Sequence, residues 1–232
     1  MGLRMLSNEQ GVADKFNRYL RDMGKRKGIT VHDFSLGGQD RHAGADYLLS
    51  DSSRFALVEF KFVEANIRDE IRKSRRLKLC QKLQVQPDMR QLHDLCHFVA
   101  WYDKPTLCVF TNVYRREVCN QRMFGSNSNL HDISSDPSLR ATAQNFAQEF
   151  LDTPSHNRSL NLQEFEIYLA WLLQTTSGAS ASSVELLTSD PLKEGELALV
   201  WFPSVEEAYR WMQEHKPKPA PADDNESRPT FR

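Results

Sequence analysis

The stretch that most constrains the fold is residues 44–62, GADYLLSDSSRFALVEFKF. Two largely apolar runs flank turn-forming residues at 51–54, a pattern typical of a β-hairpin. Three charged residues, Asp46, Glu59 and Lys61, nevertheless lie within these apolar runs. Because an unpaired charge costs several kcal/mol to bury, these side chains need ion partners, a metal ion or a catalytic role.

The length of the turn predicts which residues of the hairpin face one another. A four-residue loop places Ser50 opposite Phe55, and the same antiparallel register places Asp46 opposite Glu59. Side chains alternate along a strand, so Glu59 and Lys61 share one face with Asp46, while the opposite face is apolar throughout. Directly opposed residues have Cβ atoms about 5 Å apart. Two carboxylates at that distance share a proton or hold a cation.

A hard divalent cation suits such a pair of carboxylates. Mg²⁺, or Mn²⁺ in its place, takes oxygen ligands and usually keeps several waters, so Asp46 and Glu59 are candidate metal ligands. Lys61 points the same way, and its ammonium group could hold an attacking water and stabilise charge on a phosphate. The structural alternative is an ion pair between Glu59 and Lys61 at the rim of the sheet, with Asp46 only starting a turn.

These residues resemble the signature of the PD-(D/E)XK, or restriction-endonuclease-like, nuclease superfamily. Asp46 matches its first acid, and Glu59-Phe60-Lys61 matches the E-x-K triplet on the next strand. The family order of helix, three strands, helix and strand fits residues 8 to about 102. Many members carry a glutamate on the first helix, for which Glu9 is the candidate; its alternative role is to complement the helix dipole.

The chain departs from the family pattern at two points. Ala45 stands where the name of the superfamily has proline. Gln81 is followed four residues later by Val85, which argues against the subgroup with a Q-x-x-x-Y motif. The resemblance covers less than half of the chain and rests on three or four residues.

The resemblance implies an α/β fold with a mixed central sheet flanked by helices and with additional C-terminal helices. We expect a nuclease core over 1–124, an extension packed on it over 125–215 and a disordered tail over 216–232. The implied activity is Mg²⁺-dependent hydrolysis of phosphodiester bonds in DNA, with RNA as an alternative substrate, in phage defence, toxin action or DNA repair. Asp46 and Glu59 would bind the metal, helped by the Phe60 carbonyl and Glu9, and Lys61 would position water.

The remaining helices and strands are predicted from the spacing of apolar residues and from residues that cap or stop helices. Apolar spacing and helix caps predict five helices, and apolar runs predict strands outside the hairpin. The expected helices are 8–23, 66–86 (stopped by Pro87), 138–151 and 161–174, with a fifth over 205–215 capped by Ser204, and the expected strands are 29–35, 96–102, 106–114 and 196–202.

The helix expected over 66–86 is strongly basic. It holds seven basic residues against two acidic ones, a local charge of +5 in a chain whose net charge is −1. Phosphate contacts dominate nucleic-acid affinity, so such a helix beside a metal site favours nucleic-acid binding. The candidate nucleic-acid-binding residues are Arg68, Arg72, Arg75, Arg76, Lys78 and Lys82. The alternative is a solvated helix face.

Two further classes of function stay open. One is a nuclease-like module that has lost catalysis and binds nucleic acid or a protein partner. The other is an interaction protein that meets an acidic partner, or a second copy of itself, through the basic helix. The chain has no apolar run of 18 residues and no secretory signal in MGLRMLSNEQ, so we expect no membrane association and a cytoplasmic location.

The four cysteines do not form the framework of a small disulfide-rich protein. Cys80, Cys96, Cys108 and Cys119 lie in apolar contexts, and we expect free thiols in a reducing compartment. The alternative is a zinc site built on the cluster of His93, Cys96 and His97, completed by Cys80 or Cys119.

Overall fold

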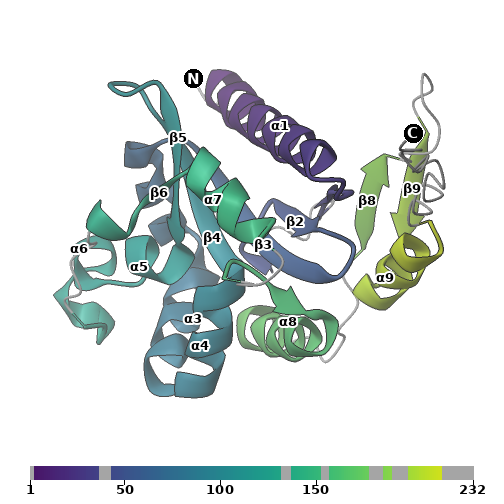
Figure 1. Ribbon diagram of the computed structural model, residues 1–232. Helices are drawn as coiled ribbons and strands as arrows, with labels where there is room; N and C mark the ends of the chain where they lie inside the picture. Colours follow the sequence, from purple (N-terminus) through teal and green to yellow (C-terminus); the bar gives the residue numbers. More distant parts are fainter. Residues whose placement is uncertain are drawn as a thin grey trace, which may run out of the picture.

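The computed structural model describes residues 3–36, 43–131, 137–152, 157–177, 185–189 and 198–215. The fold is α/β, with a mixed, largely antiparallel central sheet flanked by helices (Figure 1). The elements are α1 (Leu3–Arg26), β1 (His32–Ser35), β2 (Tyr47–Ser50), β3 (Arg54–Val63), the 3₁₀ helix η1 (Glu64–Arg72), α3 (Ser74–Val85), α4 (Pro87–Cys96), β4 (His97–Asp103), β5 (Cys108–Val113), α5 (Tyr114–Val118), α6 (Gln121–Phe124), η2 (Ser126–Ser128), η3 (Pro137–Leu139), β6 (Ala141–Thr142), α7 (Ala143–Phe150), β7 (Leu160–Asn161), α8 (Leu162–Ser177), β8 (Leu186–Ser189), β9 (Leu199–Phe202) and α9 (Val205–Glu214). The part of the chain described here contains no helix that is both long and apolar enough to cross a bilayer.

Strand β3 lies in the middle of the sheet. Across the described residues the strand order is β6-β5-β4-β3-β2-β1-β8-β9, and β7 pairs with the start of β3. The β3–β4 pair is parallel, and the other pairs are antiparallel. Strands from residues 125–215 therefore join both edges of the same sheet.

Over its regular pairs, the register of the hairpin is the one that the sequence predicts. Ser50 pairs with Phe55 across the turn, as expected. The regular pairing extends as far as Tyr47 and Val58. Beyond it the backbone N–H of Asp46 donates to the carbonyl of Val58 at 2.9 Å, one residue out of the register that would pair Asp46 with Glu59. The charged residues thus lie at the end of the hairpin that is farthest from its turn.

The two faces of the sheet bury separate cores. Helices α1 and α7 cover one face, where Phe60 meets Phe16 of α1, and α3, α4 and α8 cover the other (Figure 1). Leu57 and Trp101 face the second group of helices. The alternation predicted for β3 is therefore present, with Glu59 and Lys61 replacing apolar residues near the end of the strand.

The expected continuous helix over 66–86 is wrong in two respects. The segment divides into η1 and α3 at Lys73, whose backbone is extended (φ −86°, ψ 99°). Pro87 begins helix α4 rather than only stopping the preceding helix. Proline is favoured at the first position of a helix because its missing N–H would have no intrahelical partner there.

Other boundaries differ at the ends of elements. Helix α1 begins at Leu3, before the expected start at residue 8. Residues 141–142 form the edge strand β6, so helix α7 begins at Ala143 and not at residue 138. Ser204 caps α9 as predicted, its side chain accepting from the Glu207 N–H. The tail expected over 216–232 lies outside the described residues.

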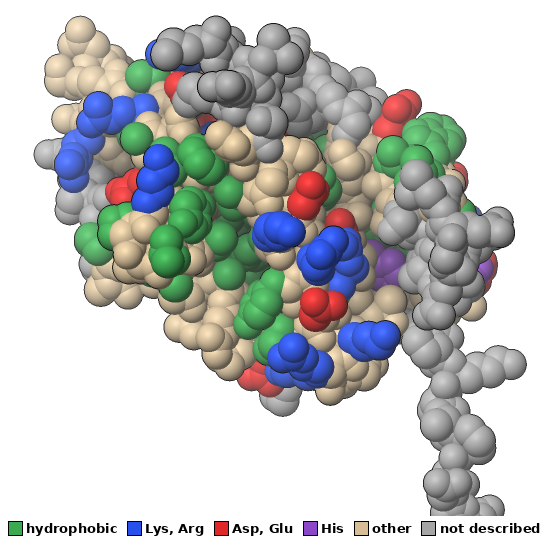
Figure 2. Space-filling view, turned by 90° about the horizontal axis from the view of Figure 1, so that it is seen from above, with side chains coloured by type: hydrophobic (Ala, Val, Ile, Leu, Met, Phe, Trp, Pro, Cys, Tyr) green, Lys and Arg blue, Asp and Glu red, His purple; other side chains and the backbone are tan. Residues whose placement is uncertain are grey.

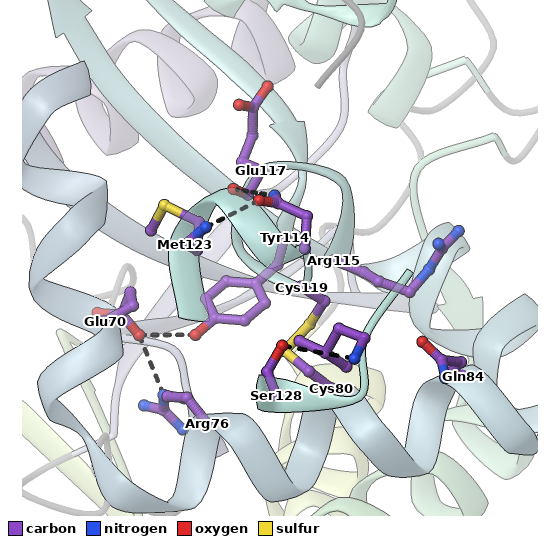
Figure 3. The surroundings of a disulfide bond; sticks show 12 residues. Glu70, Arg76, Cys80, Gln84, Tyr114, Arg115, Glu117, Cys119, Met123 and Ser128 are labelled. Carbon is purple, nitrogen blue, oxygen red and sulfur yellow. Dashed lines mark hydrogen bonds and ion pairs between the residues drawn. A yellow bond between two sulfur atoms is a disulfide. The ribbon is translucent and has the colours of Figure 1, made fainter. Parts of the chain in front are cut away.

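The expectation of four free thiols is wrong for one pair. Cys80 of α3 and Cys119, the residue after α5, form a disulfide (Figure 3). The two cysteines are 39 residues apart, and only the meeting of α3 with the end of α5 brings them together. Cys96 and Cys108 are free, as expected. Because Cys80 and Cys119 bind one another, neither completes the zinc site considered above.

Candidate functional site

Seven charged side chains meet at the end of the hairpin and form what we term the ion cluster. Lys61 lies at its centre. The ammonium nitrogen of Lys61 contacts four oxygens: Oε1 of Glu59 at 2.5 Å, Oε1 of Glu9 at 2.9 Å, the Phe60 carbonyl at 3.0 Å and Oε1 of Glu70 at 3.2 Å. The other members are Asp46, Lys73 and Arg76. The predicted acids Glu9, Asp46 and Glu59 are therefore brought together with Lys61.

Asp46 is held by the backbone of the neighbouring strand. The N–H of Phe60 donates to Oδ2 of Asp46 at 2.6 Å, and Asp46 also accepts from Leu36 through its backbone carbonyl. Burial raises the pKa of Asp46 well above its usual range, and the nearby charge of Glu59 raises it further. This is the behaviour expected of two carboxylates that face one another without enough cations between them.

Glu59 is fully buried, and both of its closest cations lie on one oxygen. Lys61 and Lys73 contact Oε1 at 2.5 and 2.7 Å. Burial by itself would raise the pKa of Glu59, but these lysines and Arg76 outweigh burial and hold the pKa below its usual range. The second oxygen, Oε2, is buried and has no hydrogen-bond partner among the described residues. A buried carboxylate oxygen left without a donor is costly unless a cation or water binds it.

The sequence did not identify Glu70 as part of the site. Glu70 is fully buried on η1 and binds Lys73 at 2.7 Å through Oε1. Its Oε2 accepts from Arg76 Nε at 3.0 Å and from the Tyr114 hydroxyl at 2.6 Å (Figure 3). One available signal was that Glu70 is one of only two acids in a strongly basic segment.

Lys73 was likewise missed as a member of the site. Its ammonium bridges Glu59 and Glu70 at 2.7 Å each, because the extended backbone at Lys73 turns the chain between η1 and α3 back toward the hairpin. The side chain is 36% exposed, against 6% for Lys61. Lys73 is therefore the more accessible of the two lysines that reach Glu59.

The predicted nucleic-acid-binding residues are not all at the surface. Arg76 is fully buried in the ion cluster, so it is not available to bind phosphate at the surface as expected. Arg72 is exposed and lies 3.4 Å from Asp69, and Arg75 is half-buried. Arg68, Lys78 and Lys82 are exposed.

A chain of buried hydrogen bonds supports the turn that precedes Asp46. The Arg115 N–H donates to Nε2 of His93, so Nδ1 of His93 carries the proton and donates to the Tyr168 hydroxyl at 2.6 Å. Tyr168 then donates to Nδ1 of His97 at 2.7 Å, and Nε2 of His97 donates to the Gly44 carbonyl at 2.8 Å. Both histidines are therefore neutral, and they are joined through the hydroxyl of Tyr168. Their role in this chain of hydrogen bonds is structural.

Gly44 itself allows a close approach within this turn. Its φ of +71° favours glycine, and a Cβ at this position would lie 2.7 Å from Nη1 of Arg76. The absence of a side chain thus lets the buried guanidinium of Arg76 reach the backbone two residues before Asp46. Arg76 therefore contacts both Glu70 of the ion cluster and the turn at Gly44.

The residues present fit a divalent cation in part. Asp46 and Glu59 supply carboxylate oxygens, one of them without a donor, and Mg²⁺ is commonly held by one or two carboxylates plus water. As the side chains stand, however, no three His, Cys, Asp or Glu side chains in the described part of the chain are arranged to hold a metal ion together. The cations of Lys61 and Lys73 already neutralise much of the charge on Glu59.

Comparison of the chain with protein-family models, with curated proteins and with solved structures finds no match.

Proposed function

We propose that the protein is a metal-dependent nuclease that hydrolyses phosphodiester bonds of DNA. The observation that carries this proposal is the convergence of Asp46, Glu59 and Lys61 at one end of the hairpin, with one buried oxygen of Glu59 lacking a hydrogen-bond donor among the described residues. A structural ion pair between Glu59 and Lys61 does not account for that oxygen.

The order of elements supports a restriction-endonuclease-like core. Helix α1 precedes the antiparallel strands β1, β2 and β3, helical segments follow, and β4 then pairs in parallel with β3. This is the helix, three-strand, helix and strand order of the superfamily that the motif resembles. Glu9 of the first helix reaches Lys61 at 2.9 Å, which supports its assignment to the same site.

The roles of the residues follow from their surroundings. Asp46 and Glu59, with the Phe60 carbonyl and Glu9, would hold Mg²⁺ or Mn²⁺, which supplies Lewis-acid stabilisation of charge on the phosphate. Burial by itself would lower the pKa of Lys61, but Glu59 and Glu70 outweigh burial and raise it, so Lys61 stays protonated and is not a general base. It would donate to an attacking water by giving up one of its four present oxygen contacts. Lys73, being half-exposed, is positioned to contact a phosphate oxygen.

The experiment that tests the proposal replaces Asp46 by asparagine. Asp46→Asn keeps an oxygen to accept from the Phe60 N–H but removes the charge that would bind metal. We expect the wild type to cleave DNA with Mg²⁺ or Mn²⁺ and to show a metal-dependent rise in Tm. The variant should lose both, while its Tm in EDTA stays equal or higher because the buried carboxylate has gone. Full cleavage by Asp46→Asn, or a wild type that neither cleaves DNA nor RNA nor responds to metal, would refute the assignment.

A second candidate function is a nuclease-like module that binds nucleic acid or a protein without cleaving. The observation that favours it is that Lys61 and Lys73 both neutralise Glu59, so the ion cluster is stable without a metal. Binding of an oligonucleotide with no metal-dependent cleavage by the wild type would support this function over the first.

A further inference from the structure

A cavity of about 490 Å³ lies beside the ion cluster, between η1 and the segment that contains α5 and α6. Its volume falls within the roughly 300–1,000 Å³ that is common for ligand sites. Arg68 of η1 and Arg122 of α6 line it, together with Glu64, Glu117 and Arg140. None of the proposed catalytic residues lines this cavity, so it is a separate site.

The two acids of the cavity share Arg140 as their cation, and two further arginines also line the cavity. Arg140 binds Glu117 and Glu64 at 2.9 Å each, and its guanidinium stacks over the Trp101 ring with a centroid distance of 5.0 Å. Arg68 and Arg122 are exposed, and neither has a carboxylate within ion-pair distance in the described part of the chain. The cavity therefore presents two guanidinium groups to an anion.

The other lining groups favour a phosphate over a specific base. The Asn120 side chain accepts from the Met123 N–H and donates one of its two amide hydrogens to the Glu117 carbonyl, both at 3.1 Å. Ile67 and Met123 add apolar surface without hydrogen-bonding groups in their side chains. Arginine binds phosphate through paired N–H donors, whereas nothing here reads the edge of a base.

The cavity is close enough to the ion cluster to hold the same strand. Arg68 and Glu70 lie two residues apart on η1, which corresponds to about 4 Å along a 3₁₀ helix. Phosphates of one nucleic-acid strand repeat about every 3.4 Å along a duplex axis. The cavity and the ion cluster therefore draw residues from the same short helix, η1.

The face of the molecule on which α1 lies differs from the cavity in how its charges are distributed. There Lys and Arg side chains are interspersed with Asp and Glu (Figure 2). Such a mixture provides no concentrated positive field on that face. The two arginines of the cavity, whose acidic neighbours are bound by Arg140, are better placed to select an anion.

We propose that this cavity is a phosphate subsite, in which Arg68 and Arg122 hold the backbone of a nucleic-acid strand next to the bond at the ion cluster. The inference rests on the proposed nuclease function for its substrate, and it adds Arg122, which the sequence did not single out. The subsite binds without regard to base identity.

The test measures binding without cleavage. A fluorescein-labelled single-stranded oligonucleotide is titrated with the wild type, with the double variant Arg68→Gln/Arg122→Gln, and with Arg26→Gln as a matched control. Arg26 is an exposed arginine at the end of α1 that does not line the cavity. EDTA is present throughout, so failure of the catalytic proposal does not alter the readout, and far-UV circular dichroism checks that each variant is folded.

We expect the double variant to bind at least 10-fold more weakly, with a log–log salt slope reduced by about 1.4 if each arginine neutralises one phosphate of a single strand. Arg26→Gln should bind as the wild type does. Unchanged affinity and slope in the double variant, an equal loss in Arg26→Gln, or no binding by the wild type would overturn the proposal. Equal competition by a poly-glutamate peptide would assign the site to acidic proteins instead and would also overturn it.

Discussion

The disulfide between Cys80 and Cys119 allows a quantitative prediction about stability. The perturbation is the double variant Cys80→Ser/Cys119→Ser, which removes the cross-link with little change in side-chain volume. The bond joins α3, which carries Arg76, to the end of α5, which carries Tyr114. Gln81 also holds the segment after Cys119, donating to the Ser128 carbonyl at 2.9 Å, so the native arrangement retains other contacts.

The magnitude follows from the length of chain that the bond closes. The two cysteines are 39 residues apart. The chain-entropy relation for a loop of that length gives a loss of about 13 cal/mol/K in the unfolded state, or about 3.9 kcal/mol at 25 °C. Because the effect acts mainly on the unfolded chain, we expect a loss of about 3–4 kcal/mol in the free energy of unfolding.

Urea unfolding followed by tryptophan fluorescence measures this loss. With an m-value of about 3 kcal/mol/M, the unfolding midpoint should fall by about 1.3 M in the double variant and by a similar amount when a dithiol reductant is added to the wild type. Cys108→Ser is the control, because Cys108 is free and exposed, and it should leave the midpoint unchanged.

A thiol count completes the assay. The denatured, unreduced wild type should expose two reactive thiols, and the reduced protein four. Identical midpoints for the wild type and the double variant, or four thiols without reduction, would refute the reasoning.

Three further predictions concern the ion cluster and the buried histidines. Lys73→Met should lower kcat/KM for Mg²⁺-dependent cleavage about 100-fold, because Lys73 is the more accessible cation beside the buried carboxylates. The matched change Lys25→Met, at an exposed lysine in the last turn of α1, should not, and equal effects in steady-state assays would contradict this role. Burial lowers the pKa of His97 to about 4 and that of His93 well below its usual value, so between about pH 6.5 and 4 the unfolded chain binds more protons than the folded one. The free energy of unfolding should therefore decline as the pH falls through that window, and a flat profile in urea titrations would count against it. Tyr168→Phe leaves a buried donor and a buried acceptor unpaired and should cost about 2–4 kcal/mol at pH 7, which the same titrations would detect.

The hairpin and its charged end could be read from the sequence because they depend on local rules. Alternation of apolar residues assigns the faces of β3, and the length of the turn sets Ser50 opposite Phe55. From that register, the positions of Asp46, Glu59 and Lys61 follow without any long-range contact. The cap at Ser204 is local in the same sense, since its partner lies three residues away.

The rest of the ion cluster depended on contacts between distant elements. A helical pattern cannot show that the chain turns at Lys73, that Glu70 is buried by Tyr114 from 44 residues away, or that Arg76 faces inward. The disulfide could not be predicted from local patterns either, because its two cysteines lie 39 residues apart. Local periodicity reports which side of an element is apolar, but whether a charged side chain is buried depends on which oppositely charged groups the other elements bring to it, and only the tertiary structure determines that.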